Sequence, residues 1–266
     1  MMYDLIIIEF LEYKNMSISE IILLEYSPIS LKEMENIKLM NRTDTKYILS
    51  KEKLNELLSL AVNDYFVQQI NGERNISYYT NYLDTSDDDM YITHHNGRYV
   101  REKIRIRSYV SSNLNFLEVK NKNNKGCTNK KRIRISSLDS LEKEGGRRFL
   151  DENAWYNLDQ LSFSLENKFN RITLVNKLKT ERLTIDSNIR FHNIKNDKRI
   201  SLDNVAIVEL KRNGRSYSPI RSILQDLNIQ PSGFSKYCIG RALTDKSLKQ
   251  NMFKTKIRRI LEINNN

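Results

Sequence analysis

Four segments of this chain carry a charged side chain at every second residue, a spacing that could assemble a binding site for phosphate groups. The segments are 101–107, 117–120, 130–135 and 208–211. Successive strand residues point to opposite faces of a sheet, so this period places charged groups on one face and apolar groups on the other. Arginine grips phosphate oxygens with a planar guanidinium fork, and lysine adds a compact positive charge. For any single strand, a solvated outer face of an antiparallel sheet is the simpler interpretation.

Several such strands in one chain favour a concentrated basic surface. If the sheet closes on itself, the charged faces line a basic interior that would suit a chain of phosphates. Phosphoryl transfer in such a site also needs a divalent metal, and therefore at least one carboxylate ligand. Glu209 lies in the otherwise apolar stretch 205–210, where a carboxylate is costly to bury without a partner. A metal ligand and a structural ion pair are both compatible with this placement.

The composition indicates a protein with a modest core and a surplus of positive charge. The chain has 266 residues, of which 39% are hydrophobic and 29% are charged, enough for one large domain or two small ones. It contains 44 Lys and Arg against 33 Asp and Glu, so its net charge of +11 favours anionic partners. The two cysteines and three histidines lack the spacing of a metal site or a disulfide framework. No Walker-type or dinucleotide-binding glycine motif occurs.

The apolar residues do not form a membrane-spanning stretch. The run 5–8 is followed at once by Glu9 and is expected to form a strand or a short apolar tether. No stretch approaches 18 apolar residues, so we expect no transmembrane segment. These features predict a soluble, cytoplasmic protein with free thiols.

The elements that would position the charged segments follow from hydrophobic periodicity and from turn and capping residues. A three-stranded meander is predicted at 98–110, 115–122 and 130–136, with further strands at 46–49, 77–83, 168–175, 181–191 and 204–211. Helices are predicted at 51–61 after the cap Ser50, within 139–166, and at 221–227 and 235–248. Trp155 is expected to anchor the core, and the end of the basic tail is expected to be disordered. The pattern indicates an α+β fold, with an accessory segment 1–40, a central domain 41–245 and a basic C-terminal tail 246–266.

Several short motifs stand in a fixed order along the central part of the chain. They are RTDTKY at 42–47, YLDT at 82–85, REKIRIR at 101–107, LEVK at 117–120, Lys130, NR at 170–171, RLTID at 182–186, IVELK at 207–211 and FSKY at 234–237. In this order they resemble the VTC (vacuolar transporter chaperone) domain, the polyphosphate polymerase branch of the triphosphate tunnel metalloenzymes. The resemblance covers roughly residues 40–245.

The resemblance implies a fold, an activity and a set of site residues. The implied fold is an antiparallel eight-stranded β-barrel that forms a closed tunnel with flanking helices. The implied activity is that of a metal-dependent polyphosphate polymerase, which uses Mn or Mg to move the γ-phosphoryl group of ATP onto a growing polyphosphate chain and releases ADP. Carried over position by position, the phosphate-binding set is Lys46, Arg105, Arg107, Lys120, Lys130, Arg171, Arg182 and Lys236. The same comparison makes Glu209 the metal ligand, Ser235 a polar phosphate contact, and Glu118 a support for the metal or for the orientation of Lys120.

Two positions depart from the family pattern and leave other functions open. Gly233 stands where a basic residue is frequent, and Phe169 stands where a tyrosine is frequent. The alternatives are a tunnel-fold triphosphatase or polyphosphatase, and a non-enzymatic protein that binds polyphosphate or another polyanion. The expected ligands are ATP, polyphosphate or pyrophosphate, and a membrane partner in trans is compatible with the sequence. Nucleic acid is disfavoured, because Arg105 and Arg107 alternate with isoleucines rather than with aromatic residues that could stack on bases, although Tyr109 is close.

Overall fold

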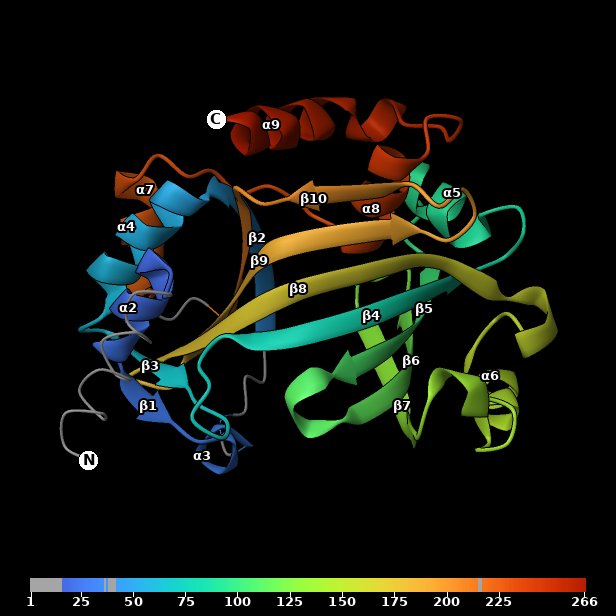
Figure 1. The fold of residues 1–266 in the computed structure, drawn as a ribbon, viewed down its shortest axis with the longest axis horizontal. Coiled ribbons are helices and arrows are strands. Elements are labelled where there is room, and N and C mark those ends of the chain that lie inside the picture. Colours follow the sequence, from blue (N-terminus) through green and yellow to red (C-terminus); the bar gives the residue numbers. More distant parts are fainter. Residues whose placement is uncertain (1–15, 36, 38–41, 215–216) are drawn as a thin grey trace, which may run out of the picture. The chain divides into compact units, whose positions relative to one another are not determined.

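The computed structural model describes residues 16–266 with the exception of 36, 38–41 and 215–216, and the chain divides into two compact units. The first unit comprises Met1–Asn75, Arg171–Asp186 and Val205–Gly233, and the second comprises Ile76–Asn170, Ser187–Asn204 and Phe234–Asn266. Strands β8 (Ser162–Asn176) and β9 (Glu181–Asn193) each contribute residues to both units (Figure 1).

The first unit is a sheet with helices packed on it. Its complete elements are the strands β1 (Ser27–Ile29), β2 (Arg42–Ser50), β3 (Tyr65–Gln68) and β11 (Val205–Asn213), and the helices α2 (Ile18–Leu24), α3 (Leu31–Glu35), α4 (Lys51–Ala61) and α7 (Pro219–Asp226). Strand β11 pairs in antiparallel fashion with both β2 and β9, and β3 pairs likewise with β8. Strand β1 pairs with β3 in parallel. Ser50 caps α4 as predicted, since its hydroxyl accepts a hydrogen bond from the backbone N–H of Lys53 at 3.3 Å.

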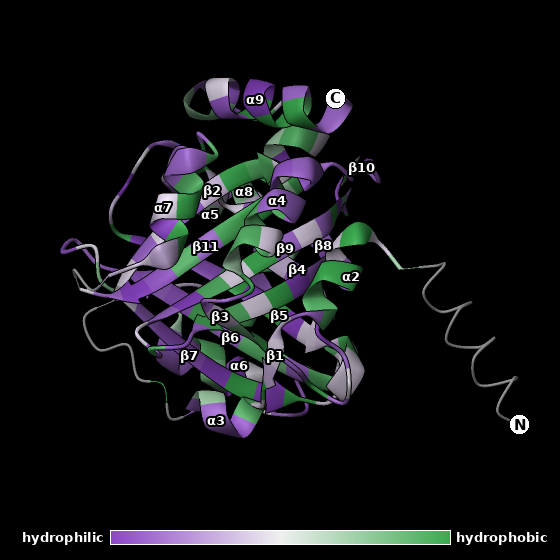
Figure 2. Ribbon diagram, turned by 90° about the vertical axis from the view of Figure 1, so that its left-hand side faces the viewer, coloured by the Kyte–Doolittle hydropathy of each residue, from purple (hydrophilic) through white to green (hydrophobic). Residues whose placement is uncertain are grey.

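The strands of the first unit separate their apolar and charged residues onto opposite faces. Val208 and Leu210 of β11 join a core with Leu54, Leu57 and Leu58 of α4. Because the strand period is two, the intervening residues of β11 project from the other face. Helix α2 completes the cover over α4 but leaves apolar side chains at its surface, and Figure 2 shows α2 mainly in the hydrophobic colour. The sheet therefore has one face committed to the core and one available for charged side chains.

The second unit holds the predicted meander. Its complete strands are β4 (Ile76–Asp84), β5 (Arg101–Tyr109), β6 (Leu114–Lys122), β7 (Thr128–Ile135) and β10 (Arg199–Leu202). Its helices are α5 (Asp89–His95), α6 (Gly146–Asn153), α8 (Lys236–Thr244) and α9 (Lys254–Asn265), with 3-10 turns η1 (Val110–Ser112), η2 (Leu138–Ser140), η3 (Leu158–Gln160) and η4 (Asn251–Phe253). Strands β4, β5, β6 and β7 pair in antiparallel order, which confirms the three-stranded meander (Figure 1). Ile104, Ile106 and Leu117 are fully buried on one face, as the alternation predicted.

The large antiparallel sheet confirms the α+β class, but the strand count differs from the prediction. The described residues form eleven strands rather than eight, because short strands such as β1, β3 and β10 add to the longer ones that the periodicity revealed. The hydrogen-bonded order is an open path with β2 and β7 at its ends. The closed tunnel therefore remains a prediction. No helix among the described residues is long and apolar enough to cross a membrane.

Three local predictions were wrong for physical reasons. Segment 139–166 is helical mainly in α6, and strand β8 already begins at Ser162. Trp155 is 50% exposed, and its contact with the buried Glu102 is made by its backbone N–H rather than by its ring. The end of the tail is not disordered: α9 buries Ile260, and Asn204 donates a side-chain hydrogen bond to the carbonyl of Ile263 at 2.9 Å. These contacts join α9 to the segment that follows β10.

A buried polar network fixes α5 and α8 of the second unit. The fully buried carboxylate of Asp84 accepts hydrogen bonds from the backbone N–H groups of Thr85, Met90 and Tyr91 at 2.8–3.0 Å. It also accepts the hydroxyl proton of Tyr237, in the first turn of α8. The network places the start of α8, which carries two of the predicted site residues, against the end of β4.

The buried carboxyl of Glu102 should make the folded protein less stable as pH rises. This carboxyl is 1% exposed, and burial raises its pKa from 4.5 to about 7 although the N–H of Trp155 donates to it at 3.1 Å. A raised pKa means that the folded state holds the proton more tightly, so stability is present below pH 4.5 and lost as pH rises through about 7. The loss amounts to about 3 kcal/mol at about 1.4 kcal/mol per pKa unit. We expect Glu102→Gln to remove this dependence.

Urea unfolding at about pH 5 and about pH 8 measures the effect. The matched control is Glu152→Gln on the exposed side of α6, which should keep the pH dependence of the wild type. A variant at Glu102 that loses as much stability between the two pH values as the wild type would show that the carboxyl is not the cause.

Candidate functional site

The predicted site residues of the first unit gather around Glu209 on the charged face of the sheet. In the register of the strands, Glu209 lies opposite Lys46 of β2 and opposite Thr184 of β9. Its carboxylate is 3.6 Å from the Lys46 ammonium and 2.9 Å from the ammonium of Lys211, two residues along the same strand. We call Lys46, Glu209 and Lys211, together with Arg171, the Glu209 cluster.

The charges of the Glu209 cluster stabilise one another. Burial would raise the pKa of Glu209, but Lys46, Lys211 and Arg171 hold it well below its usual range, so the group is a carboxylate at any physiological pH. Burial lowers the pKa of Lys211, although Glu209 acts in the opposite direction. The cluster therefore holds one firmly ionised acid among three basic side chains.

The two arginines of this face each have a further partner. Arg171 makes a two-pronged contact with Asp186, at 2.6 and 2.8 Å. Arg182 lies opposite Lys211 in the register and donates a hydrogen bond to the carbonyl of Met34 at 3.3 Å. The structure thus brings Lys46, Arg171, Arg182 and Glu209, which the family resemblance assigned to the site, to one face of the sheet.

The predicted site residues of the second unit gather around Glu118. Its side chain is 1% exposed and accepts hydrogen bonds from Arg105, with Nε at 2.8 Å and Nη2 at 2.7 Å, and it also pairs with the ammonium of Lys130. Burial would raise its pKa, but Arg105, Arg107 and Lys130 lower it from 4.5 to about 2. We call Arg105, Arg107, Glu118 and Lys130 the Glu118 cluster.

The cations of the Glu118 cluster are held close enough to affect one another. Burial lowers the pKa of Lys130, and the nearby charges of Arg105 and Arg107 act in the same direction, while Glu118 opposes them. Lys120 lies directly between Lys103 and Lys130 in the strand register, so three ammonium groups form a row across β5, β6 and β7. Such a face gains from binding an anion, because the anion relieves the mutual repulsion.

The start of α8 brings the last two predicted residues to the same unit. Ser235 caps α8 by accepting from the N–H of Cys238 at 3.3 Å, and its hydroxyl accepts a hydrogen bond from Lys103 at 2.9 Å. The ammonium of Lys236 lies 4.3 Å from the centre of the Phe169 ring. Phe169, which lacks the tyrosine hydroxyl frequent in the family, thus serves as a cation–π support.

The sequence predictions missed several residues that the structure adds to the site. Lys103 and Lys211 are each two positions from a predicted residue, so the alternation that revealed Arg105 and Glu209 also indicated them. Asp186 was part of a motif but had no assigned role. Tyr82 lies opposite Arg105 in the register and raises the pKa of its guanidinium, and no local pattern indicated this pairing.

The side chains around Glu209 allow one way of holding a divalent cation. Among the residues that the structure describes, no group of three or more His, Cys, Asp or Glu side chains is arranged to hold a metal ion. Magnesium is commonly bound by one or two carboxylates together with substrate phosphates. Glu209 fits binding of this kind, because it is ionised. Its oxygens now contact the ammonium groups of Lys46 and Lys211, and a bound phosphate could attract these ammonium groups and leave the carboxylate for the metal.

Comparison with known proteins identifies a family for most of the chain. The VTC domain model matches residues 41–244. The search of curated proteins gave no significant match.

Solved structures give more distant similarities. The Hippeastrum protein HpAC1, which has a dominant triphosphatase activity, is 15% identical over 77% of this chain and 97% of its own, with a TM-score of 0.44. A conserved hypothetical protein from Pyrococcus furiosus is 12% identical over 71% of this chain and 92% of its own, with a TM-score of 0.40. These scores are too low to define the fold of this chain.

Proposed function

This chain belongs to the VTC domain family, and on that basis we propose that it is a polyphosphate polymerase-like phosphotransferase. The reaction transfers the γ-phosphoryl group of ATP to the terminal oxygen of a polyphosphate chain. The bond between the β–γ bridging oxygen and the γ-phosphorus breaks, a new P–O bond forms, and ADP leaves. The observation that supports this proposal best is the concentration of ion-paired cations around Glu118 and Glu209.

The residues would act by positioning and charge neutralisation. Phosphoryl transfer needs little covalent help from the protein, because the transferred group carries its charge on three oxygens that fixed cations can stabilise. Arg105 and Arg171 offer guanidinium forks that now grip carboxylates, and phosphate oxygens have the matching geometry. Lys46, Lys120, Lys130 and Lys236 add point charges.

The proposed metal is Mn or Mg, held by Glu209 and by phosphate oxygens of the substrate. When bound, the cation supplies additional neutralisation of the phosphate charge. The acceptor in this proposal is a chain end rather than water. Water would give a triphosphatase or polyphosphatase, and the closed tunnel would be the environment that restricts its access.

Incubation of the purified protein with ATP and Mn, followed by gel analysis of the products, tests the function. A ladder of polyphosphate together with ADP is expected. Orthophosphate without a ladder would replace the proposal by hydrolysis. Binding of ATP or polyphosphate without turnover would show that the protein binds polyanions and does not catalyse this reaction.

We predict that Arg105→Ala weakens binding of inorganic tripolyphosphate by about tenfold or more, since a hydrogen bond to a charged group contributes about 1.5–3 kcal/mol. Lys249→Ala removes an exposed charge outside both clusters and should change affinity by less than about twofold, because salt screens such a charge. Isothermal titration calorimetry measures both, and circular dichroism verifies the fold. Equal effects of the two substitutions would indicate diffuse surface attraction rather than a defined site.

A further inference from the structure

The basic face of the second unit ends in a group of aromatic rings. Tyr109 of β5 lies 5.1 Å from Tyr78 of β4 and 5.8 Å from Phe116 of β6, measured between ring centres. Arginine side chains cover two of these rings, with Arg107 5.7 Å from the centre of Tyr78 and Arg132 4.5 Å from the centre of Phe116. Tyr109 of β5 is therefore joined by aromatic residues from the two neighbouring strands. We call Tyr78, Tyr109 and Phe116 the aromatic end of the face.

The cations and the rings occupy different ends of the same strands. Lys103, Lys120 and Lys130 form one row across the ladder, and Arg105 with Glu118 forms the next. Arg107 and Phe116 form the third row, and Tyr109 follows two residues later. From Arg105 to Tyr109 the strand rises about 13 Å. A nucleoside triphosphate has the same polarity, with charge at one end and an aromatic base at the other.

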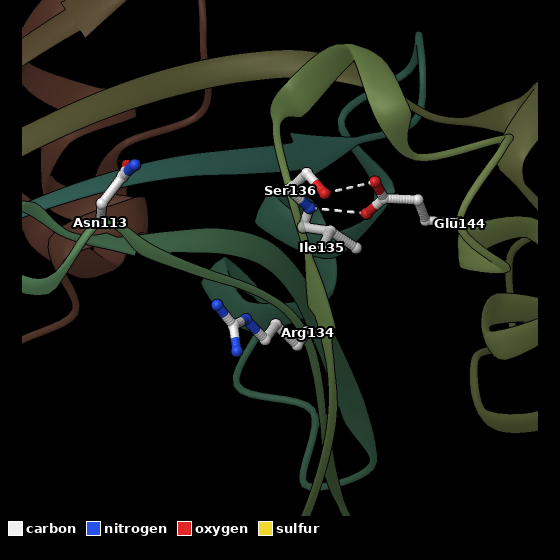
Figure 3. A pocket seen from close by; sticks show the side chains of 5 residues that line it. All are labelled: Asn113, Arg134, Ile135, Ser136 and Glu144. Atoms are coloured by element: carbon white, nitrogen blue, oxygen red, sulfur yellow. Dashed lines mark hydrogen bonds between the residues drawn. The ribbon is translucent and has the colours of Figure 1, made fainter.

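A polar hollow of about 430 Å³ lies at the same end of the strand ladder (Figure 3). It is lined by Asn113, Arg134, Ile135, Ser136 and Glu144. Asn113 lies in the turn that joins Tyr109 to β6, and Arg134 is opposite Phe116 in the register of β6 and β7.

The chemistry of the hollow suits an uncharged, hydroxyl-rich group better than a phosphate. Glu144 is ionised, because hydrogen bonds from the hydroxyl and backbone N–H of Ser136, at 2.5 and 2.6 Å, lower its pKa (Figure 3). Its remaining lone pairs can accept from sugar hydroxyls or an exocyclic amine, and they repel phosphate. The amide of Asn113 both donates and accepts, and Arg134 donates.

We propose that the hollow and the aromatic end bind the nucleoside part of the ATP whose phosphates lie on the Glu118 cluster. The base stacks against Tyr109, and the sugar or the base edge bonds with Asn113 and Glu144. This assignment rests on the proposed function and adds the residues that distinguish a nucleotide donor from inorganic phosphate chains.

The test compares ATP with inorganic tripolyphosphate as ligands of the full chain, because both carry a triphosphate and only ATP carries a nucleoside. Tyr109→Leu should raise the Kd for ATP about five- to 150-fold, the range for loss of one base–aromatic stack, and leave the Kd for tripolyphosphate unchanged. Asn113→Gly keeps the left-handed backbone of this turn, where φ is +48°, and removes the amide, so it should also weaken ATP alone. The matched control is Tyr99→Leu, an exposed tyrosine at the opposite end of β5.

The outcomes separate this inference from the function on which it rests. If tripolyphosphate binds and neither Tyr109→Leu nor Asn113→Gly affects ATP selectively, the nucleoside site is wrong while the phosphate site stands. If the wild type binds neither ligand, both proposals fail. If a single-stranded RNA binds more tightly than ATP and loses affinity in Tyr109→Leu, the face is a nucleic-acid site and the mononucleotide assignment is wrong.

Discussion

Glu209→Gln should reduce Mn-dependent turnover of ATP by at least about 100-fold, the loss typical for removal of one group that stabilises transition-state charge. The substitution is nearly isosteric and keeps an oxygen that can accept from Lys211, now 2.9 Å away. It removes the negative charge that would hold a divalent cation and that balances Lys46. Formation of ADP and polyphosphate, measured with and without Mn, tests this prediction.

Glu262→Gln on α9 is the matched control, since this acid is 64% exposed and pairs only loosely with Arg258. It should leave turnover unchanged. Unaltered activity of Glu209→Gln, with a thermal midpoint close to that of the wild type, would remove Glu209 from the proposed metal site. Binding of Mn to the substrate-free and tripolyphosphate-bound protein offers a second readout, independent of turnover.

Glu118→Gln should destabilise the fold by about 3 kcal/mol, because removal of one member of a buried ion pair leaves the other charges without compensation. Glu118 is almost fully buried between Arg105 and Lys130. The control Glu142→Gln removes an acid that is 65% exposed and pairs with Arg147, and it should cost less than about 1 kcal/mol. Urea unfolding at neutral pH measures the free energy of unfolding of both variants. Similar small losses would show that the charge of Glu118 is not needed to balance Arg105 and Lys130 in the folded protein.

Glu118→Gln should also change how the stability of the folded protein depends on pH in the acid range. The pKa of Glu118 is about 2 in the folded protein against 4.5 as the ordinary value. A lowered pKa means that its contribution is present above pH 4.5 and is lost as pH falls toward about 2. Glu118→Gln should flatten the stability curve in that window, and an unchanged curve would contradict the assignment.

The alternation of residues along the strands was sufficient to predict which side chains share a face. Ile104 and Ile106 enter the core, while Arg105 and Arg107 project to the other side with Glu118 and Lys130. The reason is local, because the period of a strand is set by backbone geometry. Ser50 likewise marked the start of α4, since a cap depends on a hydrogen bond within the first turn.

The partners of each charge could not be read from the sequence. Glu118 pairs with Lys130 because of the register between β6 and β7, and Asp84 meets Tyr237 from 153 positions away. Register and long-range packing depend on how whole faces fit together, so neither follows from a local pattern. The same reason explains the wrong prediction of a disordered tail: Ile260 of α9 is buried, and Asn264 donates a hydrogen bond to the carbonyl of Ser201 in β10 at 3.3 Å.

The sequence by itself therefore determined the class of fold, the charged faces and the family. Only the tertiary structure decided that aromatic rings from β4, β6 and β8 support the cations of β5, β7 and α8. Isoleucines next to Arg105 and Arg107 had argued against stacking residues, but neighbours along a strand point to opposite faces. Apart from residues at every second position of its own strand, the side chains that share a face with an arginine come from adjacent strands, and the sequence does not state which strands those are.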